Sequence, residues 1–502
     1  MTERGKAGWA FVLLAIATVA FGGWHYGWLN DDALNYLILA DRISLGHLPS
    51  LRPSWGDHYW AVFPAGYPTV IAAFSLLTQD AFTASKIANA VLMAGSIALT
   101  RYWLKLPLLV VASLFFCLPL LQILSFSWSE NAFIFAQMLA LCSLGRYLET
   151  GTKAWLAPFG LGLLLLLSSR YIGGFALAGY GLALAALWWS QPRKRLVAAA
   201  GVIKLAILAF GAYVLFNIQQ TGFPTGMGRA PAPESLRVLI THFARELAYS
   251  VWMLIPPLAL LWLTRATGTR PSWRFCREEK LLFIVGTTYL AILFALRSTS
   301  RFEQFSGRLL CPGMILIWLG VLHHCFGVWQ ESGRHRAAAL VLAALFFIGN
   351  TALLYRDFFY EPELATTHSA QRGLEKYEEK YGHMPDGTVI ISGGYLDPSM
   401  SWSFISPIFS DDRIFYVVAD NFPLSLEEYR GYISRLRYKG QPVPLYLFDY
   451  SEFDTVQSLS KMLEKRRVDP GLAAWIKSHF KPRSFVECRE CKMKQKLETK
   501  KP

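Results

Sequence analysis

Long apolar runs recur through the first two thirds of this 502-residue chain and constrain its fold more than any other feature. Each run extends for about 20 residues, the length that an α-helix needs to cross the hydrocarbon core of a bilayer. The runs stop at Tyr355, and an ordinary polar composition follows. The sequence therefore predicts an α-helical polytopic membrane domain over residues 1–356 and a soluble domain over residues 357–502.

About eleven transmembrane helices account for these runs. Basic residues favour the cytoplasmic side, so Arg4 and Lys6 place the N-terminus in the cytoplasm, and an odd number of spans delivers the C-terminal domain outside. The run 155–189 is too long for one span, and we divide it at Arg170. The predicted spans lie near residues 8–28, 82–103, 106–127, 130–147, the two halves of 155–189, 196–216, 247–263, a ninth ending near 296, 309–329 and 337–355.

The C-terminal domain has the pattern of an α/β fold. Residues 388–392, 413–419 and 443–448 are rich in β-branched and aromatic side chains and are expected to be strands. Ser425 precedes an acidic, apolar-periodic stretch and is expected to cap a helix.

Composition narrows the class of partner. Only 17% of residues are charged, against about 25% in a typical soluble protein, and the net charge is +14. The basic residues are scattered through short loops, which favours contact with membrane lipids over nucleic acid. Most of the seven cysteines lie in or beside apolar runs, where they behave as small hydrophobic residues. Cys488 and Cys491 have Cys-x-x-Cys spacing, and in an oxidising extracytoplasmic environment a local disulfide is favoured over a redox site.

Two adjacent carboxylates, Asp31 and Asp32, follow the first span at its outer end. In one interpretation they complement the dipole of a helix that Asn30 caps. In the other, one of them takes a proton from an acceptor hydroxyl as a general base. The two interpretations are compatible, because a capped helix is a rigid support.

Basic residues also gather on the predicted outer side, where the charge rule disfavours them. Arg170 lies at one outer helix junction, and Arg297, Arg301 and Arg308 bracket another. An anionic partner at that surface explains them, and so does a mistaken topology. Arg308 is a phosphate ligand or a helix-end anchor.

Three other residues have two interpretations each. Lys86 is a phosphate ligand or extends to the membrane interface. Glu130 is a first-turn acid or the partner of a site arginine. His58 lines a pocket, with Tyr59 beside it, or is a solvated loop residue. His323 and His324 diverge by about 100° on a helix, so we predict no metal site there.

The order of these motifs resembles the GT-C superfamily, which includes the protein O-mannosyltransferases and the lipid A aminoarabinose transferase. An acidic pair after the first span is followed by Phe-Pro-x-Gly-Tyr-Pro, which includes Tyr67. Further along, segments resembling family motifs occur near Lys86, Glu130, Arg170 and Arg308. The acidic pair here is Asp-Asp, where the family commonly has Asp-Glu. The resemblance covers residues 8–355.

The resemblance implies a glycosyltransferase that inverts the anomeric carbon of a polyprenyl-phosphate-linked sugar at the outer face of the bacterial inner membrane. It implies Asp31 as the base, with Asp32 orienting the acceptor, holding a metal or capping the helix. The acceptor is an envelope glycan, lipid or protein. The resemblance leaves open whether the enzyme uses a divalent cation (Mg²⁺ or Mn²⁺). Beside the resemblance, the residues themselves offer Lys86, Arg170, Arg301 and Arg308 as candidate ligands of the donor phosphate, and His58, Tyr59, Tyr67 and Glu130 as candidate pocket residues.

Three rival functions are weighed against this one. A glycan ligase or polymerase uses a diphosphate-linked donor. A transporter or flippase places ionisable groups near the bilayer midplane and often has repeated halves, whereas the charges here cluster at helix ends and no repeat is visible. A non-catalytic assembly factor is the third.

Overall fold

A computed structural model of the full chain gives the architecture. It describes residues 3–26, 28, 31–47, 49, 61–226, 234–264, 275–300, 305–326 and 336–360, and six strand segments between residues 388 and 483. The chain divides into two compact units. The first comprises Met1–His25, Phe63–Asn217 and Pro231–Tyr360, and the second comprises Tyr26–Val62, Ile218–Ala230 and Glu361–Pro502.

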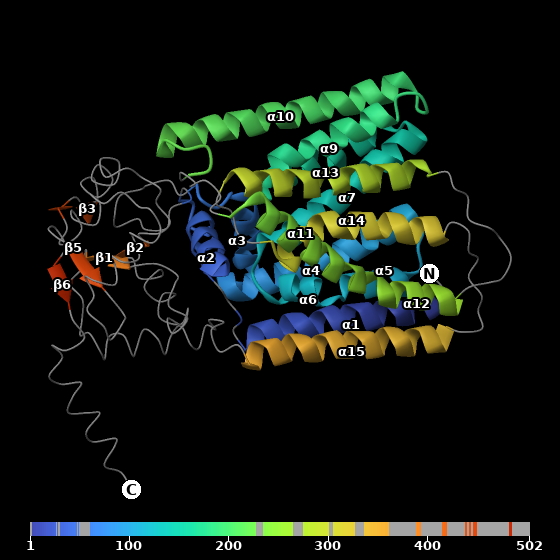
Figure 1. The fold of residues 1–502 in the computed structure, drawn as a ribbon, viewed down its shortest axis with the longest axis horizontal. Coiled ribbons are helices and arrows are strands. Elements are labelled where there is room, and N and C mark those ends of the chain that lie inside the picture. Colours follow the sequence, from blue (N-terminus) through green and yellow to red (C-terminus); the bar gives the residue numbers. More distant parts are fainter. Residues whose placement is uncertain are drawn as a thin grey trace, which may run out of the picture. The chain divides into compact units, whose positions relative to one another are not determined.

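The described part of the first unit is helical, and its helices lie side by side (Figure 1). The helices are α1 (Glu3–His25), α3 (Gly66–Thr78), α4 (Ala81–Leu104), α5 (Leu108–Phe115), α6 (Leu118–Ser125), α7 (Ser129–Thr150), α8 (Leu156–Ser169), α9 (Ile172–Ala186), α10 (Arg193–Thr221), α11 (Leu236–Ser250), α12 (Ile255–Thr264), α13 (Arg277–Thr299), α14 (Gly307–Phe326) and α15 (Arg336–Tyr360). Two short 3-10 helices, η2 (Lys153–Trp155) and η3 (Val251–Leu254), precede α8 and α12.

Local sequence explains where several helices begin and end. The Asp80 carboxylate accepts hydrogen bonds from the amides of Phe82 and Thr83 and so caps the start of α4. Gly151 follows α7 with a φ of 75°, a left-handed conformation that favours glycine. These signals fix the helix ends at which the charged residues lie.

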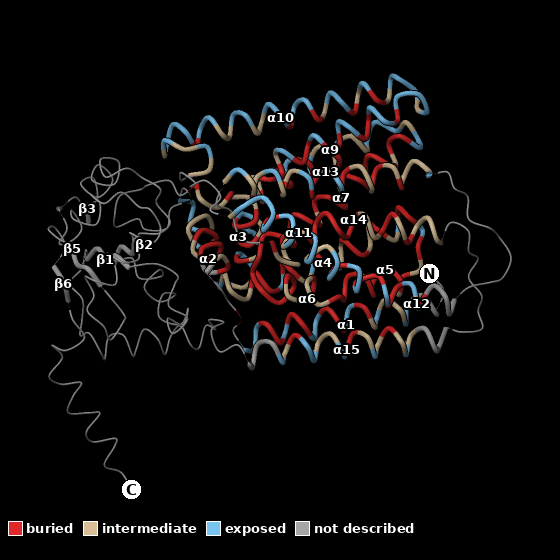
Figure 2. The backbone as a smooth tube through the Cα atoms, viewed as in Figure 1, coloured by how far each residue is buried: buried red, intermediate tan, exposed pale blue. Residues whose placement is uncertain are grey.

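Packing separates a buried centre from an exposed apolar surface. Helix α7 contacts α4 and α8, α13 contacts α9 and α14, and most of α7 is buried (Figure 2). Helix α10 is exposed along much of its length, and its exposed side chains include Leu205, Leu208 and Leu215. An apolar surface of this length matches the hydrocarbon core of a bilayer.

Within the described residues, six helical segments are long and apolar enough to cross a membrane, or seven if the bent pair α5–α6 counts as one. Four further apolar segments are shorter: Gly66–Thr78, Lys153–Ser169, Ile172–Ala186 and Leu340–Arg356. The chain is thus a multi-pass helical membrane protein. The count of eleven spans and the assignment of the two sides remain predictions.

The structure differs from the predicted spans in three places. The expected span 247–263 corresponds to an apolar helical segment, Leu236–Leu260, that begins eleven residues earlier. The expected span 106–127 is divided into α5 and α6, which bend by 73° at the break. Pro119 lies in the first turn of α6, where its missing amide costs no helical hydrogen bond. Helix α3 forms where only a loop was expected, and Pro68 again lies in the first turn. By contrast, the break at Arg170 between α8 and α9 is confirmed.

The second unit contains α2 (Asp31–Ser44) and six strands. The strands are β1 (Thr388–Ser392), β2 (Ile414–Val418), β3 (Arg437–Tyr438), β4 (Gln441–Pro442), β5 (Leu445–Phe448) and β6 (Lys481–Arg483). Parallel pairing gives a four-stranded sheet in the order β2-β1-β5-β6, and β3 pairs with β4 antiparallel. Strands β1, β2 and β5 fall in the three segments expected to be strands. The helix after Ser425 and the Cys488–Cys491 pair lie outside the described residues, so the α/β class and the domain boundary stay predictions.

Candidate functional site

Three charged residues from distant segments of the first unit meet at one point. Glu130 in the first turn of α7 forms ion pairs with Arg170, which follows α8, and with Arg308, which lies in the first turn of α14. Arg308 Nε lies 2.7 Å from Glu130 Oε1. The Glu130 side chain is 1% exposed, whereas those of Arg170 and Arg308 are 12% and 10% exposed. Two guanidinium groups against one carboxylate leave the cluster with a net positive charge, which suits an anionic ligand.

Aromatic packing orients one of these cations. The guanidinium of Arg308 lies 4.3 Å from the ring centroid of Trp128, and Trp128 stacks on Phe126 at 4.5 Å. The attraction of a cation to the ring face adds to the ion pair with Glu130. Arg308 is therefore held from two sides, by the Glu130 carboxylate and by the Trp128 ring.

Lys86 is buried in α4, and its Nζ donates a hydrogen bond to the carbonyl oxygen of Ser125 at 2.7 Å. It also lies 4.8 Å from the ring centroid of Phe82. The amine thus points into the helical unit toward the chain between α6 and α7, which leads to Trp128 and Glu130. This position differs from the extended one that the interface interpretation expects.

Tyr67 is fully buried, and its hydroxyl donates to Asn89 Oδ1 at 2.8 Å. Asn89 Nδ2 in turn donates to the carbonyl oxygens of Phe126 at 2.5 Å and Leu124 at 3.2 Å. Tyr67 therefore helps to support the segment that carries Trp128. Its expected place in a substrate pocket remains a prediction.

The structure describes only some of the other expected site residues. The backbone of Asp31 begins α2, as the helix-start interpretation expects, but its side chain lies outside the described part of the chain. Asp32 is half-buried in the same turn. His58, Tyr59 and Arg301 lie outside the described residues.

One ion pair was missed by the sequence argument. Buried Arg297 at the end of α13 pairs with Glu234, which lies 63 residues earlier. From the sequence, Arg297 is a basic residue on the predicted outer side that is expected to have an anionic partner. In the structure that partner is Glu234 of the same chain. Glu130 is likewise the partner of Arg170 and Arg308. Sequence spacing gave no signal for Glu234.

Comparison with known proteins rests on structure. No protein-family model matches the sequence, and no curated protein matches it. ArnT from Cupriavidus metallidurans in the apo state is similar with a TM-score of 0.51 at 12% identity, over 94% of this chain and 91% of that chain. ArnT bound to undecaprenyl phosphate gives 0.43 at 13% identity, over 92% and 89%. The oligosaccharyltransferase AglB from Archaeoglobus fulgidus, in complex with an inhibitory peptide and a dolichol-phosphate, gives 0.48 at 12% identity, over 94% and 72%.

The similarity to apo ArnT extends over nearly the whole of both chains, and it defines the class of fold. The chain has the GT-C membrane fold that the order of its motifs predicted.

Proposed function

We propose that this protein is a membrane glycosyltransferase that transfers a monosaccharide from a polyprenyl-phosphate carrier to an envelope acceptor. The observation that carries the proposal is the buried Glu130–Arg170–Arg308 cluster on a GT-C fold. When the sugar leaves its carrier, negative charge develops on the lipid phosphate. Fixed cations stabilise that charge most strongly in a site that excludes water.

Each residue has a stated role in this proposal. Arg170 and Arg308 bind the donor phosphate, and Glu130 positions both guanidinium groups. Lys86 and Arg301 add positive charge for the same phosphate. His58, Tyr59 and Tyr67 belong to the substrate pocket.

The reaction is a single displacement at the anomeric carbon. The acceptor hydroxyl oxygen forms a bond to that carbon while the bond to the phosphate oxygen breaks and its electron pair goes to the phosphate. Asp31 accepts the hydroxyl proton as general base, and Asp32 orients the acceptor. One displacement inverts the configuration of the sugar carbon.

The acceptor is a glycan, lipid or protein of the bacterial envelope, reached at the outer face of the inner membrane. Residues 357–502 lie on that side and help to select the acceptor. A ligase that uses a diphosphate-linked donor is the second candidate, because the same cations suit a diphosphate.

Direct binding of a lipid phosphate tests the proposal. The protein in nanodiscs would be titrated with undecaprenyl phosphate, the lipid that ArnT carries in one of its structures. Arg308→Gln and Arg170→Gln are each expected to weaken binding about tenfold or more, because each removes one charge-assisted contact.

Arg146→Gln is the matched control. Arg146 forms an ion pair with Glu149 on the same α7 helix, about 24 Å from Glu130 along the helix axis. This variant should bind the lipid like the wild type. If all three variants bound the lipid as tightly as the wild type, Arg170 and Arg308 would not form a phosphate site.

A further inference from the structure

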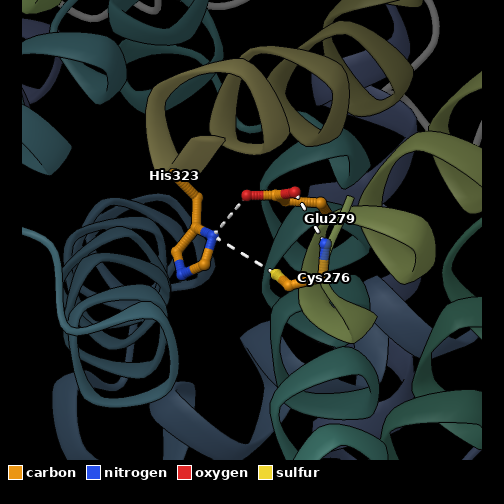
Figure 3. Close-up of side chains that lie close together, drawn as sticks. All are labelled: Cys276, Glu279 and His323. Atoms are coloured by element: carbon orange, nitrogen blue, oxygen red, sulfur yellow. Dashed lines mark hydrogen bonds and ion pairs between the residues drawn. The ribbon is translucent and has the colours of Figure 1, made fainter. Parts of the chain in front are cut away.

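A second polar cluster lies where the start of α13 meets the end of α14. Cys276 immediately precedes α13, Glu279 lies in its first turn, and His323 lies in the last turns of α14 (Figure 3). His323 is 15 residues beyond Arg308 on α14, which places it about 22 Å away along the helix axis. The cluster is therefore separate from the proposed phosphate site.

Three atoms that bind metals converge in this cluster. His323 Nδ1 lies 3.1 Å from Glu279 Oε1 and 3.7 Å from Cys276 Sγ (Figure 3). The thiol sulfur, the carboxylate oxygen and the ring nitrogen all lie within 4.8 Å of one another. All three residues are at least partly shielded from solvent.

Two of these distances are close to the edges of a tetrahedral zinc site. Zinc bonds of about 2.3 Å to sulfur and about 2.0–2.2 Å to nitrogen or oxygen give a sulfur–nitrogen edge of about 3.6 Å and a nitrogen–oxygen edge of about 3.4 Å. The observed edges are 3.7 and 3.1 Å. The third edge, between the Cys276 sulfur and the Glu279 carboxylate oxygen, is no longer than 4.8 Å.

Hydrogen bonding alone explains part of the cluster. Cys276 and Glu279 form a capping box at the start of α13, in which the Cys276 amide donates to Glu279 Oε2 at 2.9 Å. That motif does not require His323. A single ring nitrogen faces both the thiol and the carboxylate, and it can donate to or accept from only one of them at a time.

We propose that Cys276, Glu279 and His323 bind a zinc ion that ties the start of α13 to the end of α14. A thiolate, an imidazole and a carboxylate form a donor set suited to zinc, whereas Mg²⁺ and Ca²⁺ prefer oxygen ligands alone. The Cys276 thiol loses its proton on binding, and water fills the fourth position.

The second oxygen of Glu279 has supporting contacts of its own. His324 Nδ1 lies 3.2 Å from Glu279 Oε2, the oxygen that also accepts from the Cys276 amide. These contacts orient the carboxylate so that Oε1 faces His323, as groups around a metal site commonly do. The proposal departs from the expectation, drawn from the sequence, of no metal site at His323 and His324. His323 is a ligand in this proposal, and His324 acts through Glu279.

Metal content and Co²⁺ binding test this site in the full chain. Wild-type protein purified in nanodiscs without added metal is expected to contain about one zinc per chain. After zinc removal, Co²⁺ should bind and give the thiolate-to-metal charge-transfer absorption of a cysteine ligand. His323→Ala should lose the bound zinc, and Cys276→Ser should lose both the zinc and the absorption.

Cys276→Ser also separates a ligand from a cap. Serine is a good N-cap, so a purely structural Cys276 predicts unchanged or higher thermal stability in this variant. A zinc ligand predicts a lower melting temperature, and it predicts that a chelator lowers the melting temperature of the wild type but leaves that of the variant unchanged.

Cys142→Ser and His242→Ala are the matched controls, because they remove one thiol and one imidazole from α7 and α11. Both should keep the zinc and the cobalt spectrum. Wild-type protein without zinc and without the charge-transfer absorption would overturn the proposal. Equal metal content in Cys276→Ser, His323→Ala and the controls would show adventitious binding and would overturn it too.

Discussion

Glu130 holds two arginines with one carboxylate inside the membrane domain. A carboxylate that is 1% exposed has lost its hydration, and only its partners compensate for that loss. The arginines depend on Glu130 in the same way, because without it two like charges would face each other. At the scale of single residues, this carboxylate is the one on which the proposed site depends.

Glu130→Gln is therefore expected to destabilise the protein by about 3–5 kcal/mol, the usual cost of leaving a buried charge without its partner. Thermal unfolding in nanodiscs, followed by tryptophan fluorescence, measures the change. Glu149→Gln is the control. Its carboxylate pairs with Arg146 and is 43% exposed, so the expected loss is about 0–1 kcal/mol. Similar losses in the two variants would contradict the central place given to Glu130.

At the scale of helices, the charged cluster depends on how closely α7 and α8 approach. A Cβ atom on Gly162 of α8 would lie 2.8 Å from the Ala140 amide nitrogen and 3.0 Å from the Ala136 carbonyl oxygen of α7. Backbone atoms cannot rotate away as a side chain can. Only a glycine allows this packing distance between the helices that carry Arg170 and Glu130.

Gly162→Ala should therefore push the two helices apart and destabilise the protein by about 1–3 kcal/mol. Gly181→Ala on α9 is the matched control, since a Cβ there meets no atom within 4 Å and alanine favours a helix. The control should be neutral or slightly stabilising in the same thermal assay. A harmless Gly162→Ala would show that the α7–α8 contact is looser than described.

The sequence predicted helices better than it predicted their contacts. The length of an apolar run and the basic residues beside it correctly predicted α4. Arg170, within a long apolar run, correctly predicted the break between α8 and α9. The bend between α5 and α6 was missed because an apolar run looks the same whether it is straight or broken at Pro119. Cys276 and His323 were not paired, because they are 47 residues apart and only tertiary packing joins them.

At the scale of the whole molecule, the described helices make a multi-pass membrane protein, and the similarity to apo ArnT shows that it has the GT-C fold. That fold places the ends of α7, α8 and α14 together, which makes a cluster of one acid and two cations from three separate segments. The acidic pair Asp31 and Asp32 is prominent in the sequence. The central claim is that this pair carries the proton transfer of the proposed reaction.

Sugar transfer is the measurement that tests this claim most directly. Wild type, Asp31→Asn and Asp32→Asn in nanodiscs would each receive a panel of radiolabelled polyprenyl-phosphate sugars and an envelope extract as acceptor. We expect transfer by the wild type from at least one donor and a loss of about 100-fold or more in Asp31→Asn, because a general base contributes that much to the rate. A loss confined to Asp32→Asn would keep the class of enzyme and move the base to Asp32. No transfer from any donor, with lipid-linked sugar crossing the bilayer in wild type and both variants, would contradict the account and leave the acidic pair as a helix cap.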